Sequence, residues 1–274
     1  MPASQRGKIS ILVLVTLVIL AATACRNRER PSLLLITLDT TRADHLGAYG
    51  YGRDTSPNLD LLAAGGVRFV SVMSQAAVTP VSHASILTGL QPYHHGLRSL
   101  HGYRDLRLRD DVRTLAEILR DRGYETAAVI SAFPASSRFD LDRGFTHFEE
   151  GFLGEEETDQ IDMTGIVNTG ENQRRADETT RLAIEWLETN SRRPFFLWIH
   201  YFDPHDFHLL PPASYLNFCG VTAGTSREEL ISLYDCEIYF MDAQIGILLA
   251  RLRALEPEGR TLVAVTADHG EGLG

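Results

Sequence analysis

The chain alternates between short apolar runs and longer stretches with helical spacing of their apolar residues. The apolar runs are bounded by polar residues and predict buried strands at 33–38, 127–130, 195–199 and 262–265. Between them, the spacing predicts helices at 114–122, 172–190 and 226–255. Gly123 is a stop signal after the first helix, and Ser226 with Glu229 forms a capping box at the start of the last.

This order of elements predicts an α/β fold, in which helices flank a mostly parallel central sheet. In such sheets, the groups that bind ligands gather beyond the carboxyl ends of the strands. The acidic, glycine-containing segment 150–172 indicates a solvated excursion from the fold. Candidate chemistry is therefore expected among residues that directly follow a strand.

The N-terminus has the pattern of a secretory signal. Arg6 and Lys8 precede the uncharged run 9–22, and small residues follow up to Ala24, which predicts a signal peptide over 1–24. The run is shorter than the roughly 20 apolar residues that span a bilayer, although a retained anchor is the alternative. Cys25 after Ala24 resembles a bacterial lipobox, which implies a lipid on Cys25, a linker over 25–31 and a periplasm-facing lipoprotein, on the outer membrane rather than the inner.

The composition argues against nucleic acid as a partner and does not decide whether the cysteines form a disulfide. Hydrophobic residues make up 44% of the chain and charged residues 23%, which are values of a globular protein. A net charge of −10 argues against nucleic acid, whose phosphates attract basic surfaces. With Cys25 lipidated, Cys219 and Cys236 remain as a pair that forms a disulfide or stays as two buried thiols.

Two predicted strands end in acidic residues. The first is followed by Asp39, and the last by the pair Asp268-His269. A single carboxylate after a strand is most often a helix cap. Two carboxylates and an imidazole from strands of one sheet would instead suit a divalent cation.

A helix signal lies between these residues, at 78–89. Ser82 is a candidate cap for a helix that begins near His83 and ends at Gly89. Thr79 would then lie in the loop that faces the helix N-terminus, where backbone N–H groups stabilise an anion. The local pattern alone equally suits an ordinary turn before a capped helix.

The motifs resemble the sulfatase family of the alkaline phosphatase superfamily. Five stretches in family order carry the resemblance, which covers everything after residue 31: LLLITLDTTRADHLGAYGY (33–51), AVTPVSHASILTGLQPYHHG (77–96), TLAEILRDRGYETAAVISAFPASSRFDLDRGF (114–145), WIHYFDPHDFHLLPP (198–212) and AVTADHGEGLG (264–274). The stretch 234–249 adds to them. The resemblance implies a catalytic domain over 32–274.

The resemblance also implies roles for individual residues. Asp39, Asp268 and His269 match the metal ligands, and Thr79 stands where the family has its nucleophile, beside the metal. His205 matches a histidine that binds the oxyanion of the substrate. His83 replaces the arginine that supports the nucleophile, and His200, His94 and His95 are either pocket or structural residues.

Several positions depart from the family pattern. Sulfatases proper oxidise a cysteine or serine to formylglycine, which a threonine cannot give. Thr40 also replaces a second acidic ligand. A threonine nucleophile resembles the phosphodiesterases, phosphonate hydrolases and phosphoethanolamine transferases of the superfamily.

The implied function is metal-dependent cleavage of anionic sulfate or phosphate esters, with calcium as the implied cation and manganese or zinc as alternatives. In the family, further strands and pocket residues follow the Asp-His motif, whereas this sequence ends at Gly274. We therefore expect the C-terminal part of the fold to be missing. The alternatives are a degenerate chain without catalysis, or a transferase that passes a phospho group to envelope glycans or lipids.

Overall fold

The computed structural model describes residues 30–98, 107–151, 173–205, 209–221, 226–256 and 258–273. The chain divides into a segment, Met1–Pro31, and one compact unit, Ser32–Gly274. The predicted signal peptide, Cys25 and most of the acidic segment 150–172 lie outside the described residues and stay predictions. In the part of the chain that is described, no helix has the length and apolar character needed to cross a membrane.

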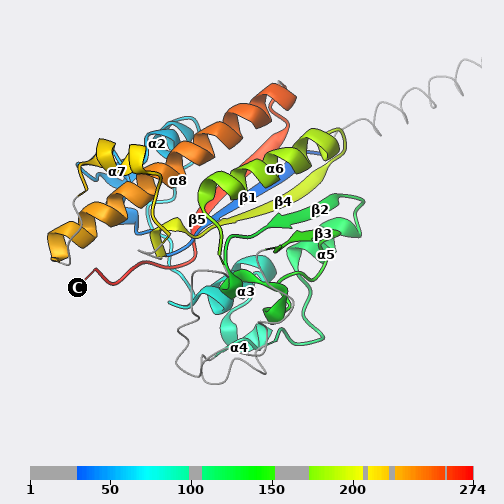
Figure 1. The fold of residues 1–274 in the computed structure, drawn as a ribbon. Coiled ribbons are helices and arrows are strands. Elements are labelled where there is room, and N and C mark those ends of the chain that lie inside the picture. Colours follow the sequence, from blue (N-terminus) through cyan, green and yellow to red (C-terminus); the bar gives the residue numbers. More distant parts are fainter. Residues whose placement is uncertain are drawn as a thin grey trace, which may run out of the picture. The chain divides into compact units, whose positions relative to one another are not determined.

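The compact unit is built on one parallel sheet of five strands (Figure 1). Its spatial order is β3-β2-β4-β1-β5, and every pairing is parallel. The strands are β1 (Ser32–Leu38), β2 (Glu125–Val129), β3 (His147–Glu149), β4 (Phe195–Tyr201) and β5 (Thr261–Ala267). The predicted α/β class with a mostly parallel sheet is confirmed. All five strands point the same way, so their carboxyl ends meet at one edge.

Helices cover both faces of this sheet (Figure 1). They are α2 (Pro57–Ala64), α3 (Thr79–Thr88), α4 (Pro92–His95), α5 (Leu115–Arg120), α6 (Ala176–Asn190), α7 (Ala213–Cys219) and α8 (Arg227–Leu255). The predicted helices at 114–122 and 226–255 correspond to α5 and α8, and the Ser226–Glu229 capping box is present. Helix α6 begins at Ala176, after the predicted start at 172.

Two hydrophobic clusters hold the helices to the sheet. One joins alternate residues of β1 and β4, such as Leu34 and Leu197, to α6 and α8. The other joins the opposite alternates, such as Leu35 and Trp198, to α3 and α5. Because both faces of the central strands are buried, these strands appear in the sequence as continuous apolar runs.

The cysteine pair forms a disulfide. Cys219 at the end of α7 is bonded to Cys236 on α8, across a sequence separation of 17 residues. Of the two alternatives that the sequence leaves open, the structure contains the disulfide, which ties α7 to the long helix.

Removing this disulfide should weaken the fold measurably. A cross-link that closes a loop of this length stabilises a protein by about 3 kcal/mol, because it restricts the unfolded chain. We expect the double variant Cys219→Ala, Cys236→Ala to unfold at lower urea concentration, and reduction of the wild type to give the same shift. An unchanged midpoint after verified reduction would show that the cross-link contributes nothing.

Candidate metal centre and nucleophile

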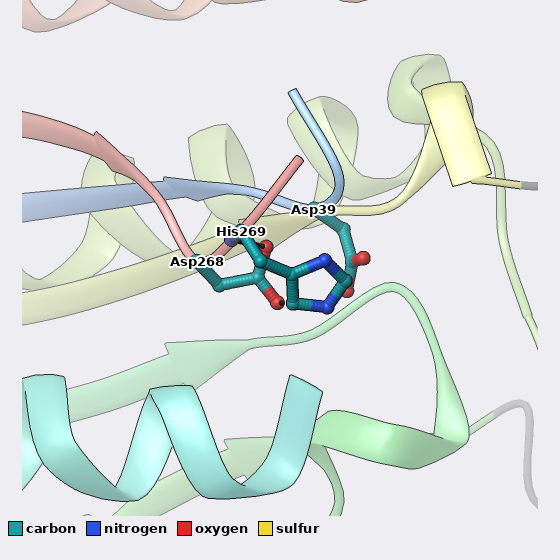
Figure 2. Close-up of side chains that lie close together, drawn as sticks. All are labelled: Asp39, Asp268 and His269. Atoms are coloured by element: carbon teal, nitrogen blue, oxygen red, sulfur yellow. Dashed lines mark hydrogen bonds and ion pairs between the residues drawn. The ribbon is translucent and has the colours of Figure 1, made fainter. Parts of the chain in front are cut away.

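Asp39 and Asp268 lie side by side at the carboxyl edge of the sheet. Asp39 directly follows β1 and Asp268 directly follows β5, and these strands are neighbours in register, with Leu38 opposite Ala267. Figure 2 shows both carboxylates and the His269 imidazole gathered at this edge. The expected proximity of these three residues, which are far apart in the sequence, follows from the strand order.

The three side chains have the geometry of a cation site. One ligand atom from each of Asp39, Asp268 and His269 lies within 4.8 Å of the others. Among the described residues, Asp39 Oδ1 and Asp268 Oδ2 are buried and have no hydrogen-bond partner. Buried carboxylate oxygens are normally paired, so these two free acceptors fit a divalent cation held by oxygen and nitrogen donors.

The backbone between the strands holds the second carboxylate in place. Thr40 has a positive φ of 48°, which is uncommon for a β-branched residue. Its N–H donates to Asp268 Oδ1 at 3.1 Å, and its carbonyl accepts from the Tyr234 hydroxyl at 2.7 Å. The strained turn therefore leaves Asp268 Oδ2 available on the side of the cluster.

Hydrogen bonds fix the imidazole of His269 in one tautomer. Its Nδ1 lies 3.0 Å from the Gly270 carbonyl, which can only accept, so Nδ1 carries the proton. Nε2 keeps its lone pair and lies 3.4 Å from Asp268 Oδ2. This is the arrangement in which a histidine binds a metal through Nε2 while its other nitrogen is held by a backbone carbonyl.

Burial disfavours the ionised form of both carboxylates. It raises the pKa of Asp268 to about 6, with a further rise from the charge of Asp39. It also raises the pKa of Asp39, while protons on His205, His83 or His269 would lower that pKa. A cation bound at the cluster would remove this penalty, because it replaces the lost solvation of both carboxylates.

Thr79 lies at the cluster and begins a helix. The structure corrects the expectation that this helix starts near His83 with Ser82 as its cap: α3 starts at Thr79, and Val78 is its N-cap residue. Pro80 fits the first turn, where no N–H is needed. The Ser82 hydroxyl instead donates to the Asp268 carbonyl at 2.6 Å. Thr79 Oγ1 is therefore held in the first turn of α3, 3.3 Å from His269 Nε2.

His83 lies one turn further along α3 and is fully buried. Its Nδ1 donates to the Thr79 carbonyl at 2.8 Å, and its Nε2 accepts from the Thr37 hydroxyl at 3.0 Å. The Thr37 hydroxyl in turn accepts from the Trp198 indole at 2.9 Å. Burial lowers the pKa of His83. His83 thus supports the backbone of Thr79 as a neutral group, unlike the arginine that the family has at this position.

His200 positions Asp39, a link that the sequence leaves undecided. Its Nε2 donates to Asp39 Oδ2 at 3.0 Å, and its Nδ1 accepts from the Ser131 N–H at 3.3 Å. Burial lowers the pKa of His200 to about 3, so this ring is neutral. Ser131 lies just beyond the end of β2. This position after a strand is the sequence signal that could have marked Ser131 as a residue of the site.

The remaining histidines differ in exposure. His205 lies in the short 3-10 helix Asp203–His205 after β4, is exposed, and stacks on Phe202 with ring centroids 4.4 Å apart. His95 is buried, and its Nε2 bonds the Ser85 hydroxyl at 3.0 Å, which makes it structural. His94 is exposed beside Tyr93.

Asp203 is a buried acid in the same 3-10 helix as His205, and no sequence pattern marks it. Its Oδ1 accepts from the N–H of Ala176, the first residue of α6, at 2.9 Å. Its Oδ2 has no partner among the described residues, and burial raises its pKa to about 7. The carboxyl therefore serves as a cap for α6 and holds its proton well above the usual range.

Asp203 should make stability depend on pH. The unfolded chain releases this proton near pH 4, whereas the folded chain keeps it to about pH 7, so stability falls as pH rises through this range. Asp203→Asn keeps the acceptor for Ala176 and cannot ionise. We expect the variant to gain up to about 4 kcal/mol over wild type between pH 4 and pH 8. Urea unfolding of both proteins at pH 4 and at pH 8 measures this difference. The same change in unfolding free energy between the two pH values in both proteins would refute it.

The fold and the cluster together define the class: an α/β protein with a candidate metal centre at the carboxyl edge of a parallel sheet. The family described as Sulfatase matches residues 31–274. Human iduronate 2-sulfatase is 25% identical over 89% of this chain and 55% of its own length. Bovine arylsulfatase A is 28% identical over 93% of this chain and 55% of its own.

Among solved structures, a protein of the alkaline phosphatase superfamily from Vibrio parahaemolyticus superposes with a TM-score of 0.62 at 19% identity, covering 88% of this chain and 55% of that one. The chain belongs to the sulfatase family. It spans about half the length of the relatives it matches. The sulfatase family typically binds a divalent metal, and Asp39, Asp268 and His269 are the candidate ligands in this chain.

Proposed function

We propose that this chain carries the metal ligands and the nucleophile of a hydrolase that cleaves sulfate or phosphate esters. The observation that supports this most is the position of Thr79. Its hydroxyl lies 3.3 Å from His269 Nε2, within the cluster that Asp39 and Asp268 complete, and at the N-terminal turn of a helix. A hydroxyl, an anion-favouring helix end and a cation site in one place suit attack on an anionic ester.

A divalent cation held by Asp39, Asp268 and His269 would supply charge to the ester oxygens and lower the pKa of the attacking hydroxyl. Thr79 Oγ1 forms a bond to sulfur or phosphorus and gives its proton to solvent. The bond from that atom to the ester oxygen breaks, and the leaving oxygen takes a proton from water. Water then cleaves the threonine adduct and releases sulfate, phosphate or, from a phosphodiester, a phosphate monoester.

Other residues of the chain hold these groups in place. His200 orients Asp39 through its hydrogen bond to Oδ2, and His83 holds the backbone carbonyl of Thr79. His205, exposed beside the cluster, is the residue that would donate to the oxygens of the bound ester. Threonine cannot be oxidised to formylglycine, so the attack would come directly from the Thr79 hydroxyl. Such an attack suits phosphate esters as well as sulfate esters.

The test is an assay of the purified chain with 4-nitrophenyl sulfate, 4-nitrophenyl phosphate and bis(4-nitrophenyl) phosphate. The protein is first stripped of metal and then loaded with calcium, manganese or zinc. We expect hydrolysis of at least one ester only after metal loading. A folded, metal-loaded chain that hydrolyses none of them would instead support the non-catalytic alternative.

Product analysis separates a hydrolase from a transferase. With water as the only acceptor and either monoester as the substrate, a hydrolase releases one inorganic sulfate or phosphate for each 4-nitrophenol formed. A transferase in the presence of added glycerol or ethanolamine would release less anion than 4-nitrophenol. An equal release under both conditions supports the proposal.

A further inference from the structure

Tyr234 on α8 holds the backbone just after the metal ligand Asp39 and has no role in the chemistry described so far. Its side chain is fully buried, and its hydroxyl bonds two backbone groups of the segment that follows β1. It donates to the Thr40 carbonyl at 2.7 Å and accepts from the Arg42 N–H at 2.9 Å. A single hydroxyl on α8 therefore fixes the backbone on both sides of Thr41.

Thr40 has a conformation that its own side chain disfavours. Its φ of 48° lies in the left-handed region, which a β-branched residue rarely adopts. The Thr40 hydroxyl is buried and has no hydrogen-bond partner among the described residues, so the side chain does not offset this cost by a hydrogen bond. The conformation is held instead by the two backbone groups of Thr40, one bonded to Tyr234 and the other to Asp268.

The same conformation fixes the rotation of the Asp268 carboxylate. Its Oδ1 accepts from the Thr40 N–H at 3.1 Å and from the His269 N–H at 2.7 Å. Its Oδ2, 3.4 Å from His269 Nε2, is the atom left for a cation. If Thr40 relaxed to an ordinary conformation, its N–H would leave Oδ1, and one of the two bonds that hold the carboxylate in this orientation would be lost.

The next residue of α8, Asp235, fixes the helix against the same part of the chain. Its Oδ1 accepts from His45 Nδ1 at 2.6 Å, and its Oδ2 accepts from the Tyr51 hydroxyl and the Arg53 guanidinium, both at 2.7 Å. Asp235 is only 6% exposed, and hydrogen bonds to a charged group in such a place are among the strong ones. The Tyr234 hydroxyl is therefore held in position before any cation binds.

We propose that Tyr234 is a positioning residue for the bound cation. Its hydroxyl keeps Thr40 in the left-handed conformation, and the Thr40 N–H in turn keeps Asp268 Oδ2 directed at the cluster. This inference rests on the proposed function, because it takes the cation to bind at Asp39, Asp268 and His269. Tyr234 contributes no ligand atom and acts through the backbone of Thr40. Loss of its hydroxyl should therefore weaken cation binding without changing the number of cations bound.

The experiment is a calorimetric titration of the full chain with manganese. Tyr234→Phe removes only the hydroxyl, and we expect it to bind one manganese ion about tenfold more weakly than wild type, which is the effect of one buried hydrogen bond. A second variant combines Tyr234→Phe with Thr40→Gly. Glycine adopts a positive φ readily and keeps the N–H that bonds Asp268, so the combined variant should return to within about threefold of the wild-type affinity. A purely structural role of Tyr234 would give no such recovery.

Two controls accompany these variants. Tyr239→Phe removes a hydroxyl from another tyrosine of α8, whose ring stacks on Phe218, and should keep the wild-type affinity. Thr40→Gly alone should bind within about threefold of wild type, since the Thr40 hydroxyl has no described partner to lose. Wild-type affinity in Tyr234→Phe, or no recovery in the combined variant, would overturn the proposal. So would a loss of about tenfold in Thr40→Gly alone, because the Thr40 side chain would then itself hold the cation.

If Tyr234→Phe does not fold, Thr40→Gly is compared with the combined variant. Equal affinities then support the proposal, and a difference of about tenfold refutes it. If the affinities follow the prediction but the wild-type chain cleaves no ester, the positioning role of Tyr234 stands and the proposed chemistry fails. Ester cleavage by the wild type together with unchanged manganese binding by Tyr234→Phe would refute the positioning role and leave the proposed chemistry in place.

Discussion

Replacing Thr79 by alanine is expected to abolish ester hydrolysis, lowering kcat/KM by about 10³-fold or more. The variant removes the one hydroxyl that lies 3.3 Å from His269 Nε2 at the start of α3, and loss of an attacking group is among the largest single effects known in enzymes. Thr79→Ser keeps a hydroxyl at the same position and should retain part of the activity. Initial rates with the best ester of the panel measure both.

Metal binding separates this effect from damage to the site. Asp39, Asp268 and His269 remain in Thr79→Ala, so the variant should still bind one cation per chain. Thr189→Ala, on the exposed part of α6, serves as the matched control and should leave the rate unchanged. Hydrolysis by Thr79→Ala at more than about a tenth of the wild-type rate would refute the nucleophile assignment.

Replacing Asp268 by asparagine should abolish the stabilisation that a bound metal gives the folded chain. A ligand that binds only the folded state at a hundred times its Kd adds about 2.7 kcal/mol of stability. In a chain of this size that raises the Tm by roughly 5–10 °C. Asp268→Asn removes the oxygen without a partner and one ligand charge, so it should lose this rise. Thermal melts with and without manganese measure the difference.

The same variant should behave differently without metal. Wild type then holds two buried carboxylates side by side, which is why the pKa of Asp268 rises to about 6 through burial and the charge of Asp39. Asp268→Asn removes one of the two charges, so the metal-free variant should be at least as stable as metal-free wild type at pH 8. Asp54→Asn, at an exposed position, is the control. A full metal-induced rise in Asp268→Asn would contradict the ligand assignment.

Much of the fold could be predicted from the sequence, because its strands are buried on both faces. The runs 33–38 and 195–199 are continuous and apolar, and each is a central strand. The meeting of Asp39 and Asp268 followed from a general rule for parallel sheets. The rule needs only that both acids follow strands, although the adjacency of β1 and β5 could not be read from the sequence.

The start of α3 could not be predicted because two signals competed. Ser82 is a favourable cap by residue type, yet its hydroxyl donates to the Asp268 carbonyl. That contact joins residues 186 positions apart, and only the folded chain brings them together. As a result, Thr79 lies inside the first helical turn and not in the loop before it.

The groups that orient the cluster could not be predicted from the sequence either. The bonds of Ser131 to His200 and of Tyr234 to Thr40 are tertiary contacts between small polar groups. The same residue types occur throughout the chain without such roles.

The central claim is that one divalent cation binds between Asp39, Asp268 and His269, next to the Thr79 hydroxyl. Anomalous scattering from crystals of the full chain soaked in manganese tests it most directly. We expect one strong peak within bonding distance of Asp39 Oδ1, Asp268 Oδ2 and His269 Nε2, with Thr79 Oγ1 in contact, and no peak there in Asp268→Asn. A peak elsewhere, or no peak at saturating manganese, would contradict the account.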